Sequence, residues 1–188
     1  WGELETVIDA AAFEKSVIIP RVSPDGKFVL FCMSDYGSFP IYHKQSDLFM
    51  LDVATGDFAP LNVNSDETDS FHCWSSNSRW IVFTSKRLDG ILGRPFICYV
   101  DEQGRTEKAF VLPQKDPNFY DNFIINYNVP ELTTHKIDVS AHALRNLAYD
   151  NENVVQATLD PRVKPRGKQG SEDMDALYQG KPIVNVSN

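Results

Sequence analysis

The 188-residue chain has no run of hydrophobic residues that approaches the ~20 needed for a membrane-spanning helix. Positively charged residues are also scarce, because 18 Lys and Arg stand against 26 Asp and Glu and leave a net charge of −8. That balance argues against a partner that is duplex nucleic acid, since such binders need a basic surface. The three cysteines (Cys32, Cys73 and Cys98) form no Cys-x-x-Cys pair, so we expect buried thiols in strands and no disulfide framework.

Motifs of common catalytic sites are absent as well. The chain holds no Gly-x-Ser-x-Gly elbow, no His-Glu-x-x-His motif and no glycine-rich phosphate loop. The acidic stretch Asp66-Glu67-Thr68-Asp69 lacks the glycine and the final glutamate of an EF-hand loop, so we expect a solvated turn there. The sequence therefore predicts no catalytic residue, no metal site, no cofactor and no enzymatic activity.

What the chain does contain is an internal repeat. The segment Ser-Pro-Asp-Gly-Lys and the apolar run after it begin at Ser23, and a related segment begins at Ser75, which gives a period of 52 residues. Each copy continues with a second apolar run and a glycine turn, at Gly56 and at Gly104. Repetition at such a period is typical of propellers and solenoids.

Each copy is predicted to form four short strands. Asp25-Gly26 between two apolar runs is a strong hairpin signal, and Asn77 tolerates the left-handed backbone that the second turn needs. Four antiparallel strands make one propeller blade, so the predicted fold class is all-β. The expected strands cover residues 17–22, 28–33, 48–53 and 58–63, then residues 70–74, 80–85, 96–101 and 108–112.

The expected domain organisation follows the two copies. We interpret residues 1–16 as the end of a preceding blade, 17–69 and 70–115 as two blades, and 116–188 as a C-terminal extension or tail. Within the extension, residues 139–149 have helical spacing with Ser140 as N-cap, and the basic run 161–168 is expected to be an extended linker or arm. Closed propellers need about four to eight blades, so we expect the remaining blades from residues upstream of Trp1 or from other chains.

The repeat resembles a known family. Ser23-Pro24-Asp25-Gly26-Lys27 before a strand is similar to the repeat mark of TolB-like and WD40-like propellers, which also occurs in the propellers of prolyl-oligopeptidase-type peptidases. Ser75-Ser76-Asn77-Ser78-Arg79 departs from the Pro-Asp-Gly centre of that mark but keeps its flanks. Over residues 17–135 the chain resembles Bacteroidota-type TolB-like proteins, through residues 34–44, 74–80, 112–117 and 127–131. The resemblance implies a six-bladed propeller, periplasmic or secreted, in the cell envelope, without an established activity.

A candidate binding surface follows from strand connectivity. Antiparallel pairing places the tight turns at one end of each blade and the loops 34–46 and 86–94, with the crossover 64–70, at the other. Long loops on a rigid frame often carry binding residues, so we predict that this long-loop end binds a ligand or partner. The candidate residues are Tyr36, Phe39, Tyr42, His43, His72, Arg87 and Arg94.

Each candidate also has a structural interpretation. The aromatic side chains could pack their loop onto a neighbouring blade, and the two histidines could simply be hydrogen-bonded. Arg87 and Arg94 could form ion pairs between blades.

The leading interpretation is a non-enzymatic propeller module that binds a protein partner or a small ligand. One alternative is the propeller domain of a larger, prolyl-oligopeptidase-like hydrolase whose catalytic residues lie outside this chain. Another is a subunit of an envelope complex that docks through residues 161–188, which carry little apolar material to fold alone.

Overall fold

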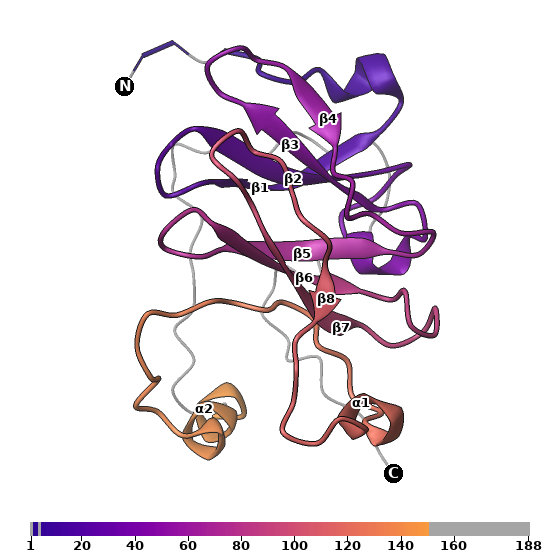
Figure 1. The fold of residues 1–188 in the computed structure, drawn as a ribbon, viewed down its shortest axis with the longest axis vertical. Coiled ribbons are helices and arrows are strands. Elements are labelled where there is room, and N and C mark those ends of the chain that lie inside the picture. Colours follow the sequence, from indigo (N-terminus) through magenta and orange to yellow (C-terminus); the bar gives the residue numbers. More distant parts are fainter. Residues whose placement is uncertain (1, 4, 151–188) are drawn as a thin grey trace, which may run out of the picture. The chain divides into compact units, whose positions relative to one another are not determined.

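The structure is a computed structural model that describes residues 2, 3 and 5–150. The chain divides into two compact units, one ending at Lys136 and the other beginning at Ile137. The first unit contains two four-stranded antiparallel sheets (Figure 1). Sheet 1 consists of β1 (Ser16–Val22), β2 (Phe28–Ser34), β3 (Asp47–Asp52) and β4 (Phe58–Pro60), and sheet 2 of β5 (Asp69–Trp74), β6 (Trp80–Ser85), β7 (Arg94–Tyr99) and β8 (Phe110–Val111).

Both sheets are meanders in which each strand pairs with the next one along the chain. This is the strand number and order of a propeller blade, and the predicted fold class is confirmed: all-β, with four-stranded antiparallel blades. The fourth strand of each blade is much shorter than expected. β4 ends at Pro60, which has no amide hydrogen to offer to the ladder. In the part of the chain that the structure describes, no helix has the length and hydrophobicity to cross a membrane.

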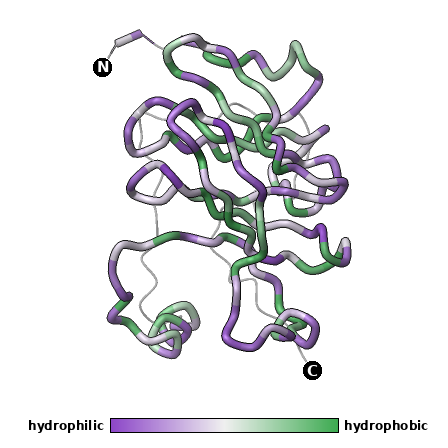
Figure 2. Tube along the Cα trace, in the orientation of Figure 1, coloured by the Kyte–Doolittle hydropathy of each residue, from purple (hydrophilic) through white to green (hydrophobic). Residues whose placement is uncertain are grey.

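The main core lies between the two sheets. Because side chains alternate along a strand, Leu30 and Cys32 of β2 face sheet 2, while Ile81 and Phe83 of β6 face sheet 1. All four are fully buried, and burying a large apolar side chain contributes about 1.5–3 kcal/mol to the stability of the folded protein. Figure 2 shows hydrophobic stretches along these strands, flanked by hydrophilic loops.

The two blades also share unusual backbone angles at equivalent positions. β1 is bulged between Ile18 and Arg21, and β5 is bulged between Ser70 and Cys73. Within the bulges, Ile19 has a φ of 56° and Phe71 has a φ of 48°, in the left-handed region that bulky side chains rarely adopt. Ile19 and Phe71 are themselves one period apart, so the two blades share this strained geometry.

The first turn of each blade is held by the same side-chain bonds. The Ser23 hydroxyl donates to Asp25 at 2.6 Å, and the Ser75 hydroxyl donates to Asn77 at 2.6 Å. Asn77 therefore replaces the aspartate of the repeat mark without loss of the hydrogen bond. Ser78, which occupies the glycine position with a φ of 59°, accepts a bond from the Asp25 amide at 3.0 Å and links the two turns.

The first part of the C-terminal extension packs on sheet 2. The Thr84 hydroxyl lies 3.0 Å from the Tyr127 carbonyl, on the face of sheet 2 turned away from sheet 1. Further along, Glu131 forms an ion pair with Arg21 of β1 at 2.6 Å. A short helix that the sequence did not suggest, α1 (Phe119–Asn122), lies in this segment.

The helix expected within residues 139–149 is present in the second unit as α2 (Ala141–Ala148). Its N-cap is Ser140, as predicted, and the hydroxyl of that residue accepts a bond from the Ala143 amide at 3.1 Å. The extended arm expected over residues 161–168 lies outside the described residues.

Candidate interaction surface

The first long loop is fixed by a short 3-10 helix, η2 (Pro40–Tyr42). Pro40 and Ile41 are buried, so the helix is anchored in the protein interior. The residues on either side point outward: Phe39 is 64% exposed and Tyr42 is 80% exposed, with their rings 6.5 Å apart. The loop therefore presents two aromatic rings from a backbone that is held in place.

A third exposed ring is held by a close contact within the same loop. Tyr36 is 69% exposed, and its ring meets the half-buried His43 edge-on at 4.6 Å between centroids. Gly37 makes this contact possible, because a Cβ at this position would lie 2.8 Å from the His43 Nε2 atom and the backbone φ is 86°.

The crossover and the second long loop join this loop to form one surface. The Thr68 hydroxyl donates to the His43 carbonyl at 2.9 Å, and Lys44 forms an ion pair with Glu67 at 2.6 Å. The Lys86 ammonium lies 5.9 Å from the centre of the Tyr42 ring, within the range of a cation–π contact. We call this area the aromatic surface; its exposed apolar residues are Tyr36, Phe39, Tyr42, Leu88 and Ile91.

The second loop is held by its own hydrogen bonds. One carboxylate oxygen of Asp89 accepts from the amides of Ile91 and Leu92, at 2.8 and 2.7 Å. Partial burial alone would raise the pKa of Asp89, but these two donors and the nearby basic side chains lower it. The carboxylate therefore stays ionised and keeps the loop in its turn.

Arg94 does not lie on this surface, which corrects the prediction that it is accessible at the long-loop end. It is only 2% exposed, and its guanidinium donates to the carbonyls of Tyr120, Phe123 and Ile125 in the extension. Its charge also lies over two aromatic rings, at 5.6 Å from Tyr120 and 5.8 Å from Phe123. Arg94 thus anchors the extension to sheet 2.

The Arg87 side chain also bonds mainly to groups within the protein. Its guanidinium bonds the buried carboxylate of Asp69 and the Val63 carbonyl, both at 2.7 Å, and lies 4.6 Å from the Phe96 ring centre. Asp69 and Glu67, two of the three carboxylates in the acidic crossover, are thus paired with Arg87 and Lys44. No cluster of potential metal ligands exists among the described residues.

His72 is fully buried between the two sheets. Its Nε2–H donates to the Leu30 carbonyl at 2.9 Å, and its Nδ1 lies 3.5 Å from the Cys32 sulfur. Burial lowers the pKa of His72 to about 4 and raises the pKa of Cys32 to about 12. At neutral pH both groups are uncharged, so this pair is a core contact and lacks the thiolate that a cysteine nucleophile needs.

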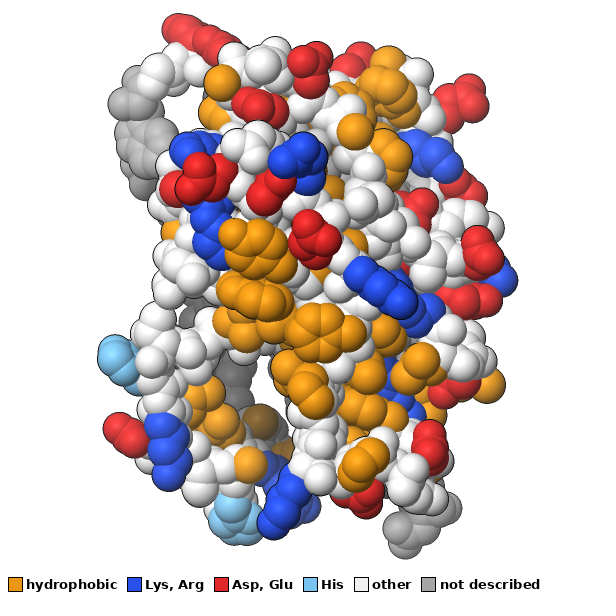
Figure 3. Space-filling model, in the orientation of Figure 1, with side chains coloured by type: hydrophobic (Ala, Val, Ile, Leu, Met, Phe, Trp, Pro, Cys, Tyr) orange, Lys and Arg blue, Asp and Glu red, His pale blue; other side chains and the backbone are white. Residues whose placement is uncertain are grey.

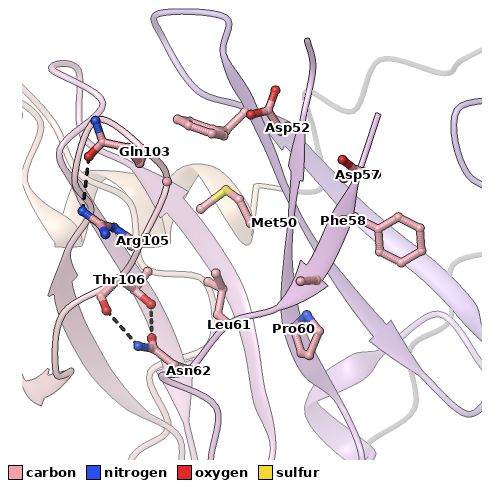
Figure 4. A pocket seen from close by; sticks show the side chains of 13 residues that line it. Met50, Asp52, Asp57, Phe58, Pro60, Leu61, Asn62, Gln103, Arg105 and Thr106 are labelled. Carbon is pink, nitrogen blue, oxygen red and sulfur yellow. Dashed lines mark hydrogen bonds between the residues drawn. The ribbon is translucent and has the colours of Figure 1, made fainter. Parts of the chain in front are cut away.

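Sequence reasoning overlooked several cavities of the described residues, among them the following two. One of about 400 Å³ opens between the sheets at their tight-turn end (Figure 4). Asp52 and Asp57 lie on one side of it and Gln103 and Arg105 on the other, with Met50 between them. The other, of about 540 Å³, lies on the face of sheet 1 turned away from sheet 2.

The outer face of sheet 2 keeps an apolar area that the extension leaves open. Figure 3 shows hydrophobic side chains gathered over β7 and β8. On this face Trp80 and Tyr99 meet edge-on at 5.5 Å, and the exposed Phe110 lines the same cavity as Trp80. This area lies at the tight-turn end of the sheet, so it is separate from the aromatic surface.

Neither the protein-family models nor the curated proteins contain a match to this chain. Among solved structures, the chain is similar to a GH74 enzyme from Niastella koreensis, with 14% identity and a TM-score of 0.39 over 52% of this chain and 15% of that one. It is also similar to the β-propeller domain of the Trilobed protease from Pyrococcus furiosus, with 22% identity and a TM-score of 0.33 over 53% of this chain and 30% of that one. A third similar structure is TolB from Acinetobacter baumannii, with 17% identity and a TM-score of 0.31 over 50% of this chain and 21% of that one. The chain thus spans less than a third of each of these proteins.

Proposed function

We propose that the chain is a non-enzymatic binding module and that its aromatic surface binds a protein partner. The observation that carries the proposal is the group of three exposed aromatic rings, Tyr36, Phe39 and Tyr42, on a loop anchored by buried residues. A few residues supply most of the binding energy in a protein interface, and aromatic side chains are enriched among interface residues and, for Tyr and Trp, among these hot spots. Because the loop is already ordered, association does not have to offset the entropy of ordering it.

The charge pattern favours an apolar contact with the partner. Lys44 is paired with Glu67, and the Arg87 charge is paired with Asp69 inside the protein. Few unpaired charges of one sign remain on the surface to attract a strongly charged partner. We therefore expect binding that depends mainly on ring burial and only weakly on salt concentration.

Catalysis by this chain is not favoured by its geometry. Cys32 lies beside His72, but both side chains are fully buried, and burial raises the pKa of the Cys32 and Cys98 thiols to about 12. The expectation that binding takes place in the cell envelope rests on the sequence resemblance.

The proposal is tested by capturing partners from an envelope extract on the immobilised chain. A triple variant, Tyr36→Ala with Phe39→Ala and Tyr42→Ala, is compared with the wild type. A matched control removes three exposed apolar side chains elsewhere, in the variant Val53→Ala with Tyr99→Ala and Phe110→Ala. Proteins that bind the wild type and the control but not the triple variant are the expected partners.

The affinity for a purified partner then measures how much the three rings contribute to binding. Truncating an interface hot spot costs at least ~2 kcal/mol of binding free energy, so if two of the three rings are hot spots, the triple variant should bind about 700-fold more weakly. A triple variant that keeps its affinity within twofold would contradict the proposed binding surface.

A further inference from the structure

The cavity at the tight-turn end has walls from both sheets. It occupies about 400 Å³ between sheet 1 and sheet 2, which is within the size range of small-molecule sites. Its floor is apolar and includes the buried side chains of Phe28, Met50 and Leu61. Because the two blades that enclose this cavity are both present in the chain, a further blade on the outer face of either sheet would leave it open.

The repeat shows which residue leaves this space open. Met50 of β3 pairs with Ala59 of β4. At the equivalent place in sheet 2, Ile97 of β7 pairs with Phe110 of β8. The two places are equivalent because the next residues across each ladder, on β2 and β6, are one period apart. Ala59 lines the cavity, so it stands where the second blade has a phenylalanine ring, and an apolar group of about that size has room there.

One wall of the cavity carries two carboxylates. Asp52 ends β3 and Asp57 precedes β4, both on the sheet 1 side (Figure 4). One oxygen of Asp52 accepts a hydrogen bond from the Ala54 amide at 2.8 Å and so holds the turn between these strands. The Asp57 carboxylate, in contrast, forms no hydrogen bond or ion pair with any of the described residues. This carboxylate is therefore available to a cationic group of a ligand.

The opposite wall carries hydrogen-bond donors. It is formed by the turn between β7 and β8, in which the Asp101 carboxylate accepts from the amides of Gln103 and Arg105, both at 2.9 Å. Gly104 allows this turn to approach sheet 1, because a Cβ there would lie 2.7 Å from the Phe28 ring. The Arg105 Nε–H donates to Asp101 at 2.7 Å, whereas its Nη1 group has no acceptor among the described residues. The guanidinium can therefore bind a carboxylate of a ligand.

We propose that this cavity binds a zwitterionic α-amino acid with a large apolar side chain. The side chain of the ligand occupies the space beside Ala59, over the apolar floor. Its ammonium group pairs with Asp57, and its carboxylate pairs with Arg105 on the opposite wall. Small-molecule sites combine apolar walls with a few polar groups that fix the orientation of the ligand. Opposite charges on opposite walls favour a zwitterion, since an amine or an acid alone would pair with only one wall.

Free phenylalanine is the probe, and each of its control compounds lacks one part of it. Phenylethylammonium lacks the carboxylate, 3-phenylpropionate lacks the ammonium group, and alanine lacks the ring. The methyl resonances of 13C-labelled methionine report the site, because Met50 lines this cavity and Met33 lines the one on the outer face of sheet 1. At pH 7 phenylalanine is expected to shift the Met50 resonance and leave the Met33 resonance unchanged. The amine and the acid should each bind about threefold more weakly, and alanine at least about tenfold more weakly.

Two charge substitutions test the walls separately. Arg105→Gln should weaken phenylalanine binding about threefold and leave phenylethylammonium binding unchanged, because that amine has no carboxylate. Asp57→Asn should weaken the binding of both compounds about threefold, whereas 3-phenylpropionate should bind no more weakly than before. The matched control is Asp66→Asn, which removes an exposed carboxylate at the long-loop end and should change no affinity by more than about twofold. Partial unfolding would weaken the binding of all these compounds alike and could not produce this selectivity.

Ala59→Phe supplies the ring that the second blade carries and should abolish the Met50 shift. Its unfolding temperature should be no lower than that of the wild type, because phenylalanine favours a strand more than alanine does. Unchanged phenylalanine binding in this variant would overturn the proposal. So would equal affinity for the amino acid, the amine and the acid, or the absence of a Met50 shift at millimolar phenylalanine. None of these outcomes bears on the aromatic surface, whose exposed rings do not line this cavity.

Discussion

Replacing His72 with glutamine should remove a defined part of the pH dependence of stability. Burial lowers the pKa of His72 in the folded protein to about 4, against 6.5 for an unperturbed histidine. The unfolded chain therefore binds more protons between these values, so this group makes stability fall as the pH falls from about 7 toward 4. Integrating between pH 7 and 4.5 gives a loss of about 2.4 kcal/mol in the free energy of unfolding.

Other groups contribute to the total pH dependence. Burial raises the pKa of Asp47 to about 6, so the folded state binds more protons there and stability is lost as the pH rises through that value. This contribution opposes that of His72 in the wild type. It cancels when the same pH change is compared between the wild type and His72→Gln, because both proteins retain Asp47.

The assay is urea unfolding at pH 7 and pH 4.5, followed by the fluorescence of Trp74 and Trp80 in sheet 2. His72→Gln should be less stable than the wild type at pH 7, since its amide fits the Leu30 carbonyl and Cys32 less well. Between pH 7 and 4.5 the variant should then lose about 2.4 kcal/mol less than the wild type. His142→Gln, at an exposed position of α2, is the control. An equal loss in the wild type and His72→Gln would refute the account of a buried, neutral histidine.

Three further predictions follow from particular contacts. Gly56→Ala and Gly104→Ala both force alanine to a φ of 77°, but only at Gly104 would the new Cβ lie 2.7 Å from the Phe28 ring. Thermal unfolding should therefore show Gly104→Ala to be the less stable by at least ~1 kcal/mol, and equal stability would contradict the close contact. Arg94→Met leaves carbonyls of the extension without a donor, so it should lower the free energy of unfolding by about 2–4 kcal/mol. It should also make residues 118–128 accessible to limited proteolysis. Wild-type resistance to the protease would show that Arg94 does not anchor this segment. Tyr36→Ala and Tyr42→Ala remove exposed rings and should change stability by less than ~0.5 kcal/mol in the same measurement, while a larger loss would indicate a packing role.

Much of the fold could be predicted because its signals are local. The apolar runs and turn residues mark the strands, and Asn77 was correctly expected to turn the chain in place of Asp-Gly. The bulges could not be predicted in this way. The positive φ angles of Ile19 and Phe71 lie within these bulges and contradict the local preferences of bulky residues.

The candidate site was harder to predict because exposure depends on distant parts of the chain. Loop position placed Tyr36 and Tyr42 at the long-loop end, and they are exposed there. The same reasoning placed Arg94 with them, but residues 120–125 fold over it, and nothing near Arg94 in the sequence reveals that contact. Asp47 lies between the expected loop 34–46 and the expected strand 48–53, and the sequence predicted no role for it. Only the register of β2 and β3 places it among aromatic side chains.

The central claim is that the aromatic surface is where this chain meets its partner. The most direct test places a photo-crosslinking phenylalanine analogue at single exposed positions in the presence of an envelope extract. Positions 36 and 42 belong to the aromatic surface, whereas positions 53 and 110 are exposed elsewhere. The account predicts a discrete crosslinked protein from positions 36 and 42 and none from positions 53 and 110. Crosslinks of equal yield from all four positions, or from positions 53 and 110 alone, would contradict it.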